Sequence, residues 1–243
     1  QDPAGDDRRR RAARERAAKE RQLRIEEAQE ELKKLKASRE QRKNKPKSEP
    51  RSSTTDPEAR QMKMGDGGFR PAYNVQFVSD GKSRLIVGVQ VVNQGSDNGL
   101  MGPMYEQLIE QYEVKPPKYL VDGGFTKTQD ITHLEQAGTQ VYAPVFQEQK
   151  QLEQGKDPYA KKRDDTPEMA EFRKRMGTPE AKTLYKERPG IAEFPNAGCR
   201  NRGLTQFQVR GLVKVKAETM WQVLAHNFLR LIHLDYLKVV MQA

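Results

Sequence analysis

Residues 119–125 read YLVDGGF, a short apolar run that is followed by Asp122 and then by two glycines. The apolar run favours a buried β-strand, and the two glycines let the backbone turn sharply where that strand ends. A carboxylate at the tip of a buried strand is well placed to hold a divalent metal ion against phosphate, because hard cations take oxygen ligands. Considered alone, a turn-forming Asp before two glycines is the more ordinary interpretation of this stretch.

The elements expected around this stretch alternate between strands and helices. Residues 72–78 and 84–92 are expected to form a hairpin, whose turn SDGKS contains an Asp-Gly pair that tolerates positive φ. This order predicts a mixed β-sheet with helices packed on it. The other elements expected here are a helix over 103–112, a strand over 118–121, a helix over 128–137 capped by Thr126 or Thr128 and stopped by Gly138, and a strand over 140–145.

The C-terminal half is predicted to be mainly helical. Residues 147–166 are polar and charged, which indicates a loop or an insertion, and a helix with an interruption at 177–179 is expected over 167–187. Residues 211–241 are expected to form an amphipathic helix that closes the core, in which a core or helix-face role is favoured for Trp221 and His226. The apolar face of this helix is expected to contain Val215, Met220, Leu224, Phe228 and either Leu231 or Ile232.

Residues 1–50 are expected to form a charged helical arm and a linker. From Asp6 to Lys45 the chain lacks both Gly and Pro and is rich in strong helix formers. Its apolar residues are too few for a core-facing stripe, so the helix either projects into solvent or pairs weakly with another helix. The block Arg8–Arg11 is compatible with a DNA-contacting surface, and equally with a solvated face.

The charge balance of the chain is strongly basic. A formal charge of +10 over 243 residues, with a pI near 9.6, points to a polyanionic partner, because a basic field attracts phosphate and releases its counterions. A basic protein without such a partner is the alternative. The length accommodates one sizeable core plus an appendage.

The cysteine content and the hydropathy indicate the compartment. Cys199 is the only cysteine, so an intramolecular disulfide is excluded and a reducing cytoplasm fits best. No apolar run reaches the roughly 20 residues that cross a bilayer, so we expect a soluble protein. The sequence begins at Gln1 rather than Met, from which we expect that preceding residues have been lost or processed.

Several long stretches together resemble a known family. The stretches are TTDPEARQMKMGDGGFRPAYNVQFVSDGKSRLIVGVQVVNQGSDNGLMGPM from Thr54, then YLVDGGF, VYAPV, and RMGTPEAKTLYKERPGIAEFPNAGCRNRGLTQFQVRGL from Arg175. They are similar to the catalytic region of DDE-type transposases from bacterial insertion sequences. The likeness runs from about residue 54 to 230. The resemblance implies an RNase H-like α/β fold for residues 51–243, in which a five-stranded mixed sheet is flanked by helices.

The resemblance also implies a site. In this family three carboxylates meet at one sheet edge and bind two Mg²⁺ ions, a role in which Mn²⁺ can serve too, for hydrolysis and strand transfer at the ends of the element. Asp122 matches the second catalytic and metal-binding carboxylate, and Glu193 matches the third. Tyr185 and Arg188 have the family's Y-x-x-R spacing ahead of Glu193, and Arg200 follows it. These three residues are implied to contact DNA, since Arg suits phosphate through its bidentate donors.

Two features depart from the family. Its first Asp lies on a first strand, in an apolar-Asp-Gly-Thr type of stretch that does not occur before Ala72 here. Pro189-Gly190 and Pro195 flank Glu193, so the helix that carries this residue is expected to be shortened or kinked. We therefore expect two of three metal carboxylates, a sheet without its first strand, and an inactive isolated chain. The other N-terminal and turn carboxylates are not expected to replace the first ligand: Asp2, Asp6, Asp7, Asp80 and Asp97.

Two functions remain open from the sequence. One is DNA transposition by metal-dependent phosphodiester cleavage and strand transfer, from an incomplete portion of a transposase. The other is a non-catalytic, truncated transposase that binds DNA and competes for element ends, for which the basic cluster is Arg200, Arg202, Arg210, Lys214 and Lys216. Either predicts double-stranded DNA, namely terminal inverted repeats and target, as partner, and either allows a homodimer. An RNA-binding protein is a weaker third option, since no aromatic stacking motif is present.

Overall fold

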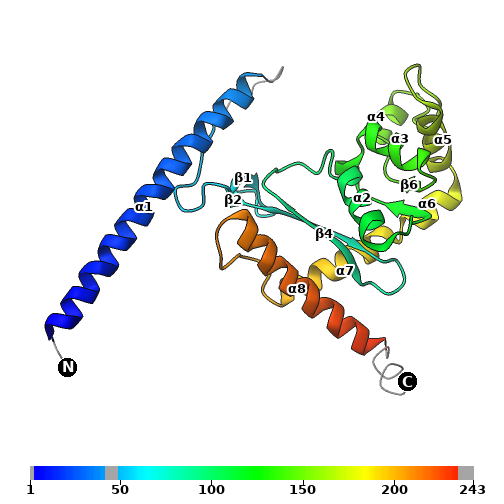
Figure 1. The fold of residues 1–243 in the computed structure, drawn as a ribbon. Coiled ribbons are helices and arrows are strands. Elements are labelled where there is room, and N and C mark those ends of the chain that lie inside the picture. Colours follow the sequence, from blue (N-terminus) through cyan, green and yellow to red (C-terminus); the bar gives the residue numbers. More distant parts are fainter. Residues whose placement is uncertain (1–2, 42–48, 235–243) are drawn as a thin grey trace. The chain divides into compact units, whose positions relative to one another are not determined.

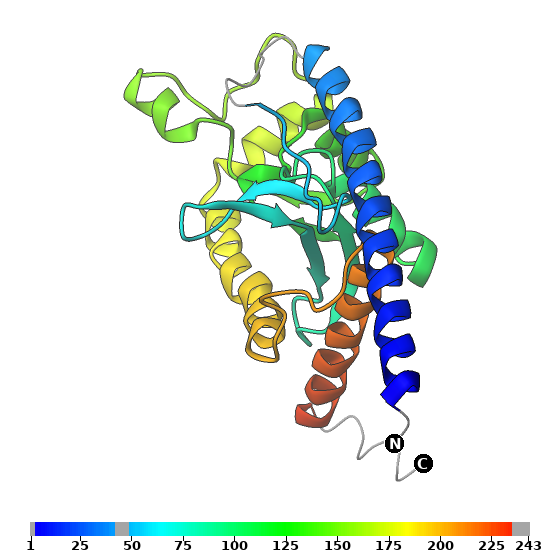
Figure 2. The same cartoon turned by 90° about the vertical axis from the view of Figure 1, so that its left-hand side faces the viewer.

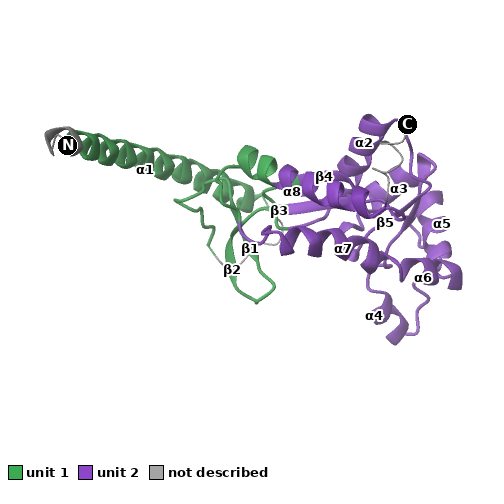
Figure 3. Ribbon diagram, turned by 90° about the horizontal axis from the view of Figure 1, so that it is seen from below, with its two compact units in different colours: residues 1–74, 91–95, 207–218 green, residues 75–90, 96–206, 219–243 purple. Residues whose placement is uncertain are grey.

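The computed structural model describes residues 3–41 and 49–234, and the chain has a mixed α/β structure (Figure 1). It divides into two compact units (Figure 3). Unit 1 comprises residues 1–74, 91–95 and 207–218, and unit 2 comprises residues 75–90, 96–206 and 219–243. The carboxylate-bearing stretch at 119–125 belongs to unit 2.

Helix α1 of unit 1 (Pro3–Glu40) confirms the long helix expected from the charged sequence. Most of its side chains are exposed, but Ala28 is buried and Glu31 is half-buried. Arg60 donates to Glu31 over 2.6 Å, which attaches the C-terminal part of α1 to the strand that contains Arg60. The end of the predicted helix and much of the predicted linker, residues 42–48, lie outside the described part.

A small hairpin forms another part of unit 1. Strand β1 (Arg60–Lys63) pairs antiparallel with β2 (Phe69–Ala72), and the Gly-rich loop at 64–68 connects them. The sequence predicted this loop but neither of the two strands. The segment before β1 caps the last helix, α8 (Leu212–His233), because Asp56 accepts from Gly211 N over 3.1 Å and Glu58 accepts from Leu212 N over 2.5 Å. Carboxylates are favourable at a helix N-terminus, where backbone donors lack partners.

The strands of the described chain pair two by two. Strand β3 (Asn74–Ser79) pairs with β4 (Ile86–Val92), and β5 (Lys118–Leu120) pairs parallel with β6 (Gln140–Tyr142). The β3–β4 connection is too short for a parallel crossover, so this pair is antiparallel. The single mixed sheet expected from the sequence is therefore not formed in the described residues, because β3 and β5 each have only one paired edge.

The β3–β4 turn differs from the prediction in which residue adopts a positive φ angle. Positive φ falls on Arg84, at 60°, and not on Gly81 of the Asp-Gly pair. Asp80 organises the turn, since its Oδ2 accepts from the N–H groups of Lys82 and Ser83, and its own N–H donates to Leu85 O over 2.9 Å. This turn places the carbonyl oxygen of Arg84 3.0 Å from Nε2 of the buried His226, so a structural role for this histidine is confirmed.

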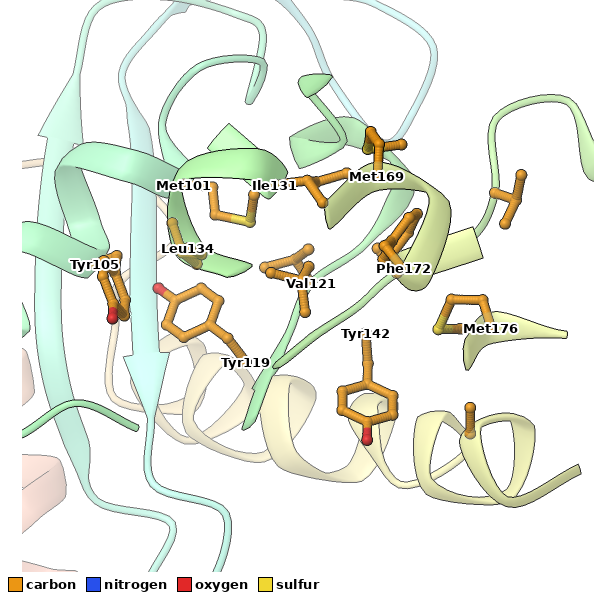
Figure 4. Packing of buried hydrophobic residues seen from close by; sticks show 14 of the residues in the cluster. Met101, Tyr105, Tyr119, Val121, Ile131, Leu134, Tyr142, Met169, Phe172 and Met176 are labelled. Carbon is orange, nitrogen blue, oxygen red and sulfur yellow. The ribbon is translucent and has the colours of Figure 1, made fainter. Parts of the chain in front are cut away.

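Four helices enclose the main core of unit 2. They are α2 (Met101–Tyr112), α3 (Thr128–Gln136), α5 (Pro167–Met176) and α6 (Pro179–Tyr185), all close to their predicted ranges. Figure 4 shows Val121, at the end of β5, surrounded by side chains of α3 and α5, with Tyr119 beside Tyr105. The apolar run before Asp122 is thus anchored in this core. The predicted insertion contains a short helix, α4 (Glu148–Glu153).

Two details of these helices correct the sequence prediction. Neither candidate threonine caps α3: its N-cap is Lys127, without a side-chain bond, and Thr126 instead donates to Gly123 O over 2.8 Å. Helix α7 (Arg188–Asn201) is a continuous helix of 14 residues and is not shortened. Pro189 lies in its first turn, where no backbone donor is needed, and Pro195 removes only one interior hydrogen bond.

The C-terminal helix buries a different face from the predicted one. Val215, Thr219, Val223 and His226 are buried, at helical spacing. Helices α7 and α8 pack on the β3–β4 hairpin through a second cluster of Ile86, Val89, Cys199 and Val223 (Figure 2). Of the predicted apolar face, Val215 is buried as expected, whereas Met220, Leu224, Phe228 and Ile232 are exposed. Trp221 is exposed as well. The hydrogen bonds of His226 and Asn227 to the hairpin orient α8 in this way. Residues 235–241 lie outside the described part.

Candidate active site

Asp122 stands at the end of β5, where the chain leaves the core. It is the N-cap of a short 3₁₀ helix (Gly123–Phe125), and its Oδ1 accepts from Gly124 N over 2.9 Å. Its side chain is 41% exposed, so the carboxylate is anchored by the backbone and remains accessible. The two glycines allow this tight turn directly after a buried strand, as the sequence indicated.

Two predicted DNA-contacting residues lie against this carboxylate. Arg188, at the start of α7, donates from Nη2 to Asp122 Oδ2 over 3.0 Å. Tyr185, at the end of α6, donates its hydroxyl proton to Val121 O over 3.0 Å. Burial raises the pKa of Tyr185, and the charge of Asp122 adds to this while that of Arg188 opposes it. The phenol therefore stays protonated and continues to act as a donor.

A second carboxylate, which the sequence did not single out as a ligand, lies beside Asp122. Asp97 follows β4 in the turn GSDNG, and Gln76 Nε2 donates to its Oδ1 over 2.6 Å. A methyl group added at Gly124 would lie 3.1 Å from Asp122 Oδ1 and 3.2 Å from Asp97 Oδ2. The two carboxylates thus converge on one side of Gly124. The sequence signal was available, since both residues follow a strand and stand next to glycine-rich turns.

A cavity of about 230 Å³ adjoins these groups. Both carboxylates, Arg188 and the strands that precede them line it. Helix α7 contributes Ile191, Ala192 and Asn196 in addition to Arg188, which is one stripe of its surface. The cavity therefore has an apolar body and a charged end.

Glu193 is not brought together with Asp122 in this structure. It lies on α7, is exposed, and is not among the residues that line the cavity; Ala192 and Asn196 face the cavity instead. Within residues 3–41 and 49–234, no three His, Cys, Asp or Glu side chains gather closely enough to hold a metal ion. The described residues therefore bring together Asp97, Asp122, Tyr185 and Arg188, without a third carboxylate.

The basic residues predicted to bind DNA belong to both units. Arg200 is exposed at the end of α7, and Arg202 donates to the sulfur of the buried Cys199 over 3.7 Å, both in unit 2. Arg210 and Lys214 are exposed in unit 1, as is Lys216. The basic residues that lie close together in the sequence are thus divided between unit 1 and unit 2.

Comparison with known proteins identifies one family. A family model described as a transposase DDE domain matches residues 24–228. Neither the curated proteins nor the solved structures compared with the chain give a significant match. None of the helices in the described residues is long and apolar enough to cross a membrane.

Proposed function

Since the chain belongs to the transposase DDE-domain family, which has a role in transposition, we propose that its unit 2 carries part of the centre that cleaves and joins phosphodiester bonds at the ends of a mobile DNA element. The observation that supports this most is the arrangement at Asp122. An anchored, accessible carboxylate has a second carboxylate on one side and an arginine on the other, beside a cavity. Phosphoryl transfer needs this combination of oxygen ligands and phosphate-binding cations.

The residues fit one divalent cation. Mg²⁺ is usually held by one or two carboxylates together with water and substrate phosphate, and Asp97 and Asp122 supply two carboxylates that converge at Gly124. When bound, Mg²⁺, or Mn²⁺ in its place, would activate water or a 3′-hydroxyl and stabilise charge on phosphate oxygens. The described residues do not fit a two-metal site. Glu193 is proposed as the third ligand on the family resemblance, and it would have to approach Asp122 from an exposed position on α7.

Arg188 has two roles in this proposal. In the structure described here its guanidinium neutralises Asp122. With DNA bound, the same donors suit a phosphate oxygen, whose charge would compete with Asp122 for them. Tyr185 positions the strand end, because its hydroxyl bonds the carbonyl of Val121, the residue before Asp122. Arg200, Arg202, Arg210 and Lys214 are proposed to hold the DNA backbone.

The finer fold assignment is also part of the proposal. We propose that residues 51–243 form an RNase H-like catalytic region with a charged insertion at 147–166, and that residues 1–50 form an arm. Under this proposal the 243 residues lack the family's first strand and first Asp, so the isolated chain is inactive. Localisation in the cytoplasm and action as a homodimer belong to the same proposal.

The alternative function is a non-catalytic protein that binds element ends and competes with an active transposase. The basic charge of the chain and the exposure of Arg200, Arg210 and Lys214 favour this alternative, because phosphate contacts alone give strong, salt-dependent DNA binding. It requires no metal site. The two functions therefore differ in whether they require the carboxylate of Asp122.

The deciding experiment combines DNA binding with strand transfer. The chain, the Asp122→Asn variant and an Arg200→Gln variant are incubated with labelled terminal inverted repeats or shuffled DNA, with Mg²⁺ or Mn²⁺ and at several salt concentrations. We expect preferential binding to the repeats and no cleavage by the isolated chain. Robust strand transfer would contradict incompleteness, and equal binding to shuffled DNA would contradict both functions. A binding affinity in Mn²⁺ that depends on Asp122 supports the catalytic proposal, whereas indifference to Asp122 supports the competitor.

A further inference from the structure

The net charge of the chain is concentrated in the N-terminal half of helix α1. Residues 8–24 contain nine Arg and Lys residues and two Glu residues, so they account for seven of the ten net positive charges. All other residues together contain 35 basic and 32 acidic side chains. The basic field that indicates a polyanionic partner therefore comes mainly from this half of α1, and only to a small extent from the units that carry Asp122 and Arg210.

The two halves of α1 differ in how their charges are compensated. The C-terminal half, residues 25–40, contains five acidic and four basic residues, and several of them form ion pairs. In the N-terminal half, every residue from 7 to 23 is exposed. Arg11 pairs there with Glu15, but the two side chains are 84% and 69% exposed, so this pair contributes little and is easily released.

Four arginines form a stripe along one face of the N-terminal half. The stripe consists of Arg10, Arg14, Arg21 and Arg24. Because each residue advances the helix by about 100° and 1.5 Å, the four lie within an arc of about 80° and over a length of about 21 Å. Glu15 and Glu20 lie outside this arc. Ala28 lies on the same face farther along α1 and is buried, whereas Figure 3 shows the half with the stripe extending away from the other elements of unit 1.

The composition of this half discriminates among polyanions. A helix that lies on a membrane has a broad apolar face, usually with aromatic residues, and a single-stranded nucleic acid is bound by stacking on aromatic side chains. Residues 3–41 contain no aromatic residue, which disfavours both partners.

The helical form of the arm discriminates between duplexes. The major groove of double-helical RNA is deep and narrow, whereas that of B-form DNA is about 12 Å wide and matches a helix about 10–12 Å in diameter. Eight of the nine cations in residues 8–24 are Arg, whose planar guanidinium donates two parallel hydrogen bonds to phosphate. Double-stranded DNA is therefore the polyanion that fits this half of α1.

We propose that α1 is a DNA-holding arm, whose arginine stripe docks in the major groove of double-stranded DNA and contacts the phosphates of the groove walls. Such contacts hold a duplex without reading its base sequence. The inference rests on the proposed function in that DNA is the substrate there. It adds a second binding surface that requires neither Asp122 nor a metal ion.

The proposal is tested by fluorescence anisotropy with a labelled duplex of shuffled sequence, about 20 base pairs or two helical turns long, in EDTA and at several salt concentrations. The stripe variant of the whole chain has the substitutions Arg10→Gln, Arg14→Gln and Arg21→Gln. The control variant removes the same charge from the opposite side of α1 by Arg9→Gln, Arg16→Gln and Lys19→Gln. Gln favours helices nearly as well as Arg and Lys, so both variants should keep α1 helical, which circular dichroism checks.

The salt dependence of binding reports how many phosphate contacts are lost. The slope of log affinity against log salt should fall by about 2.7 in the stripe variant, since each lost contact removes about 0.9, and by less than about 1 in the control. Equal losses in the two variants would overturn the stripe in favour of diffuse charge, and an unchanged stripe variant would overturn the arm altogether. Tighter or equal binding of an RNA duplex or a single strand of the same sequence would overturn the choice of double-stranded DNA. Displacement of the duplex by an equal charge concentration of polyglutamate would favour an acidic protein instead.

Two further measurements keep the result unambiguous. In the unaltered chain, bound duplex should protect Arg10, Arg14 and Arg21 from phenylglyoxal more than Arg9 and Arg16, and uniform protection would contradict the stripe even if a variant fails to fold. Asp122→Asn should leave binding of the shuffled duplex unchanged. The stripe variant should in turn keep both its Mn²⁺ affinity and its preference for terminal repeats over shuffled DNA, so the arm and the proposed catalytic centre can each fail alone.

Discussion

Replacing Gly124 by Ala tests the convergence of Asp97 and Asp122 most directly. The added methyl group would lie 3.1 Å and 3.2 Å from one oxygen of each carboxylate, closer than side chains normally approach. Gly123 is a matched control, because a methyl group there meets nothing within 4 Å. Both glycines are exposed, and neither has a left-handed backbone, so the change in chain entropy should be similar at the two sites.

The expected size follows from two opposing effects. A Gly→Ala change at a compatible position stabilises a protein by about 0.4–1 kcal/mol through the unfolded chain, and we expect this for Gly123→Ala. Gly124→Ala adds a steric cost of about 1 kcal/mol, at the low end of overpacking, because exposed carboxylates can move aside. Gly124→Ala should therefore be about 1 kcal/mol less stable than Gly123→Ala.

Urea unfolding followed by circular dichroism measures this difference, and Mn²⁺ titration monitored by electron paramagnetic resonance measures its consequence for the site. Displaced carboxylates should weaken Mn²⁺ binding several-fold in Gly124→Ala and leave it unchanged in Gly123→Ala. Equal stability and equal Mn²⁺ affinity of the two variants would refute the inferred convergence. Loss of Mn²⁺ binding in both variants would instead indicate that the 3₁₀ turn, and not carboxylate spacing, governs the site.

Three other predictions concern charged and buried groups of unit 2. Arg188→Gln should raise Mn²⁺ affinity about tenfold relative to an Arg200→Gln control. The reason is that a cation at about 4 Å opposes the binding of a divalent ion by about 2 kcal/mol in water before salt screening. An unchanged Mn²⁺ affinity would count against cation binding at Asp122. Arg175→Met should lower the free energy of unfolding by about 3 kcal/mol in urea denaturation, since it leaves the largely buried Glu135 without its partner; Arg200→Met should cost less than about 0.5 kcal/mol. Burial raises the pKa of the Cys199 thiol, with Arg202 opposing this, so a thiol reagent at neutral pH should label Cys199 only after denaturant is added; rapid labelling of the native chain would contradict its burial.

The helices and the position of Asp122 could be predicted from local chemistry. Thr166 and Thr178 each cap a helix that begins with Pro, and the apolar spacing of α2 and α5 is visible in the sequence. The face of α8 could not be predicted, since Met220 and Leu224 look as apolar as Val215 and Val223. Hydrogen bonds from His226 and Asn227 to the hairpin, about 140 residues earlier in the chain, decide which face is buried.

The sequence by itself determined that this chain has an arginine-rich helical arm and a carboxylate at a strand end, because helix formers, turn residues and apolar periodicity act over a few neighbouring positions. The family was indicated separately, by the likeness of several long stretches to known transposases. Only the tertiary structure decided which side chains meet Asp122. It placed Arg188 and Asp97 there, left Glu193 on an exposed surface, and separated the strands into pairs with an open edge beside the site. Such contacts depend on how elements distant in the chain pack, and no local pattern encodes that.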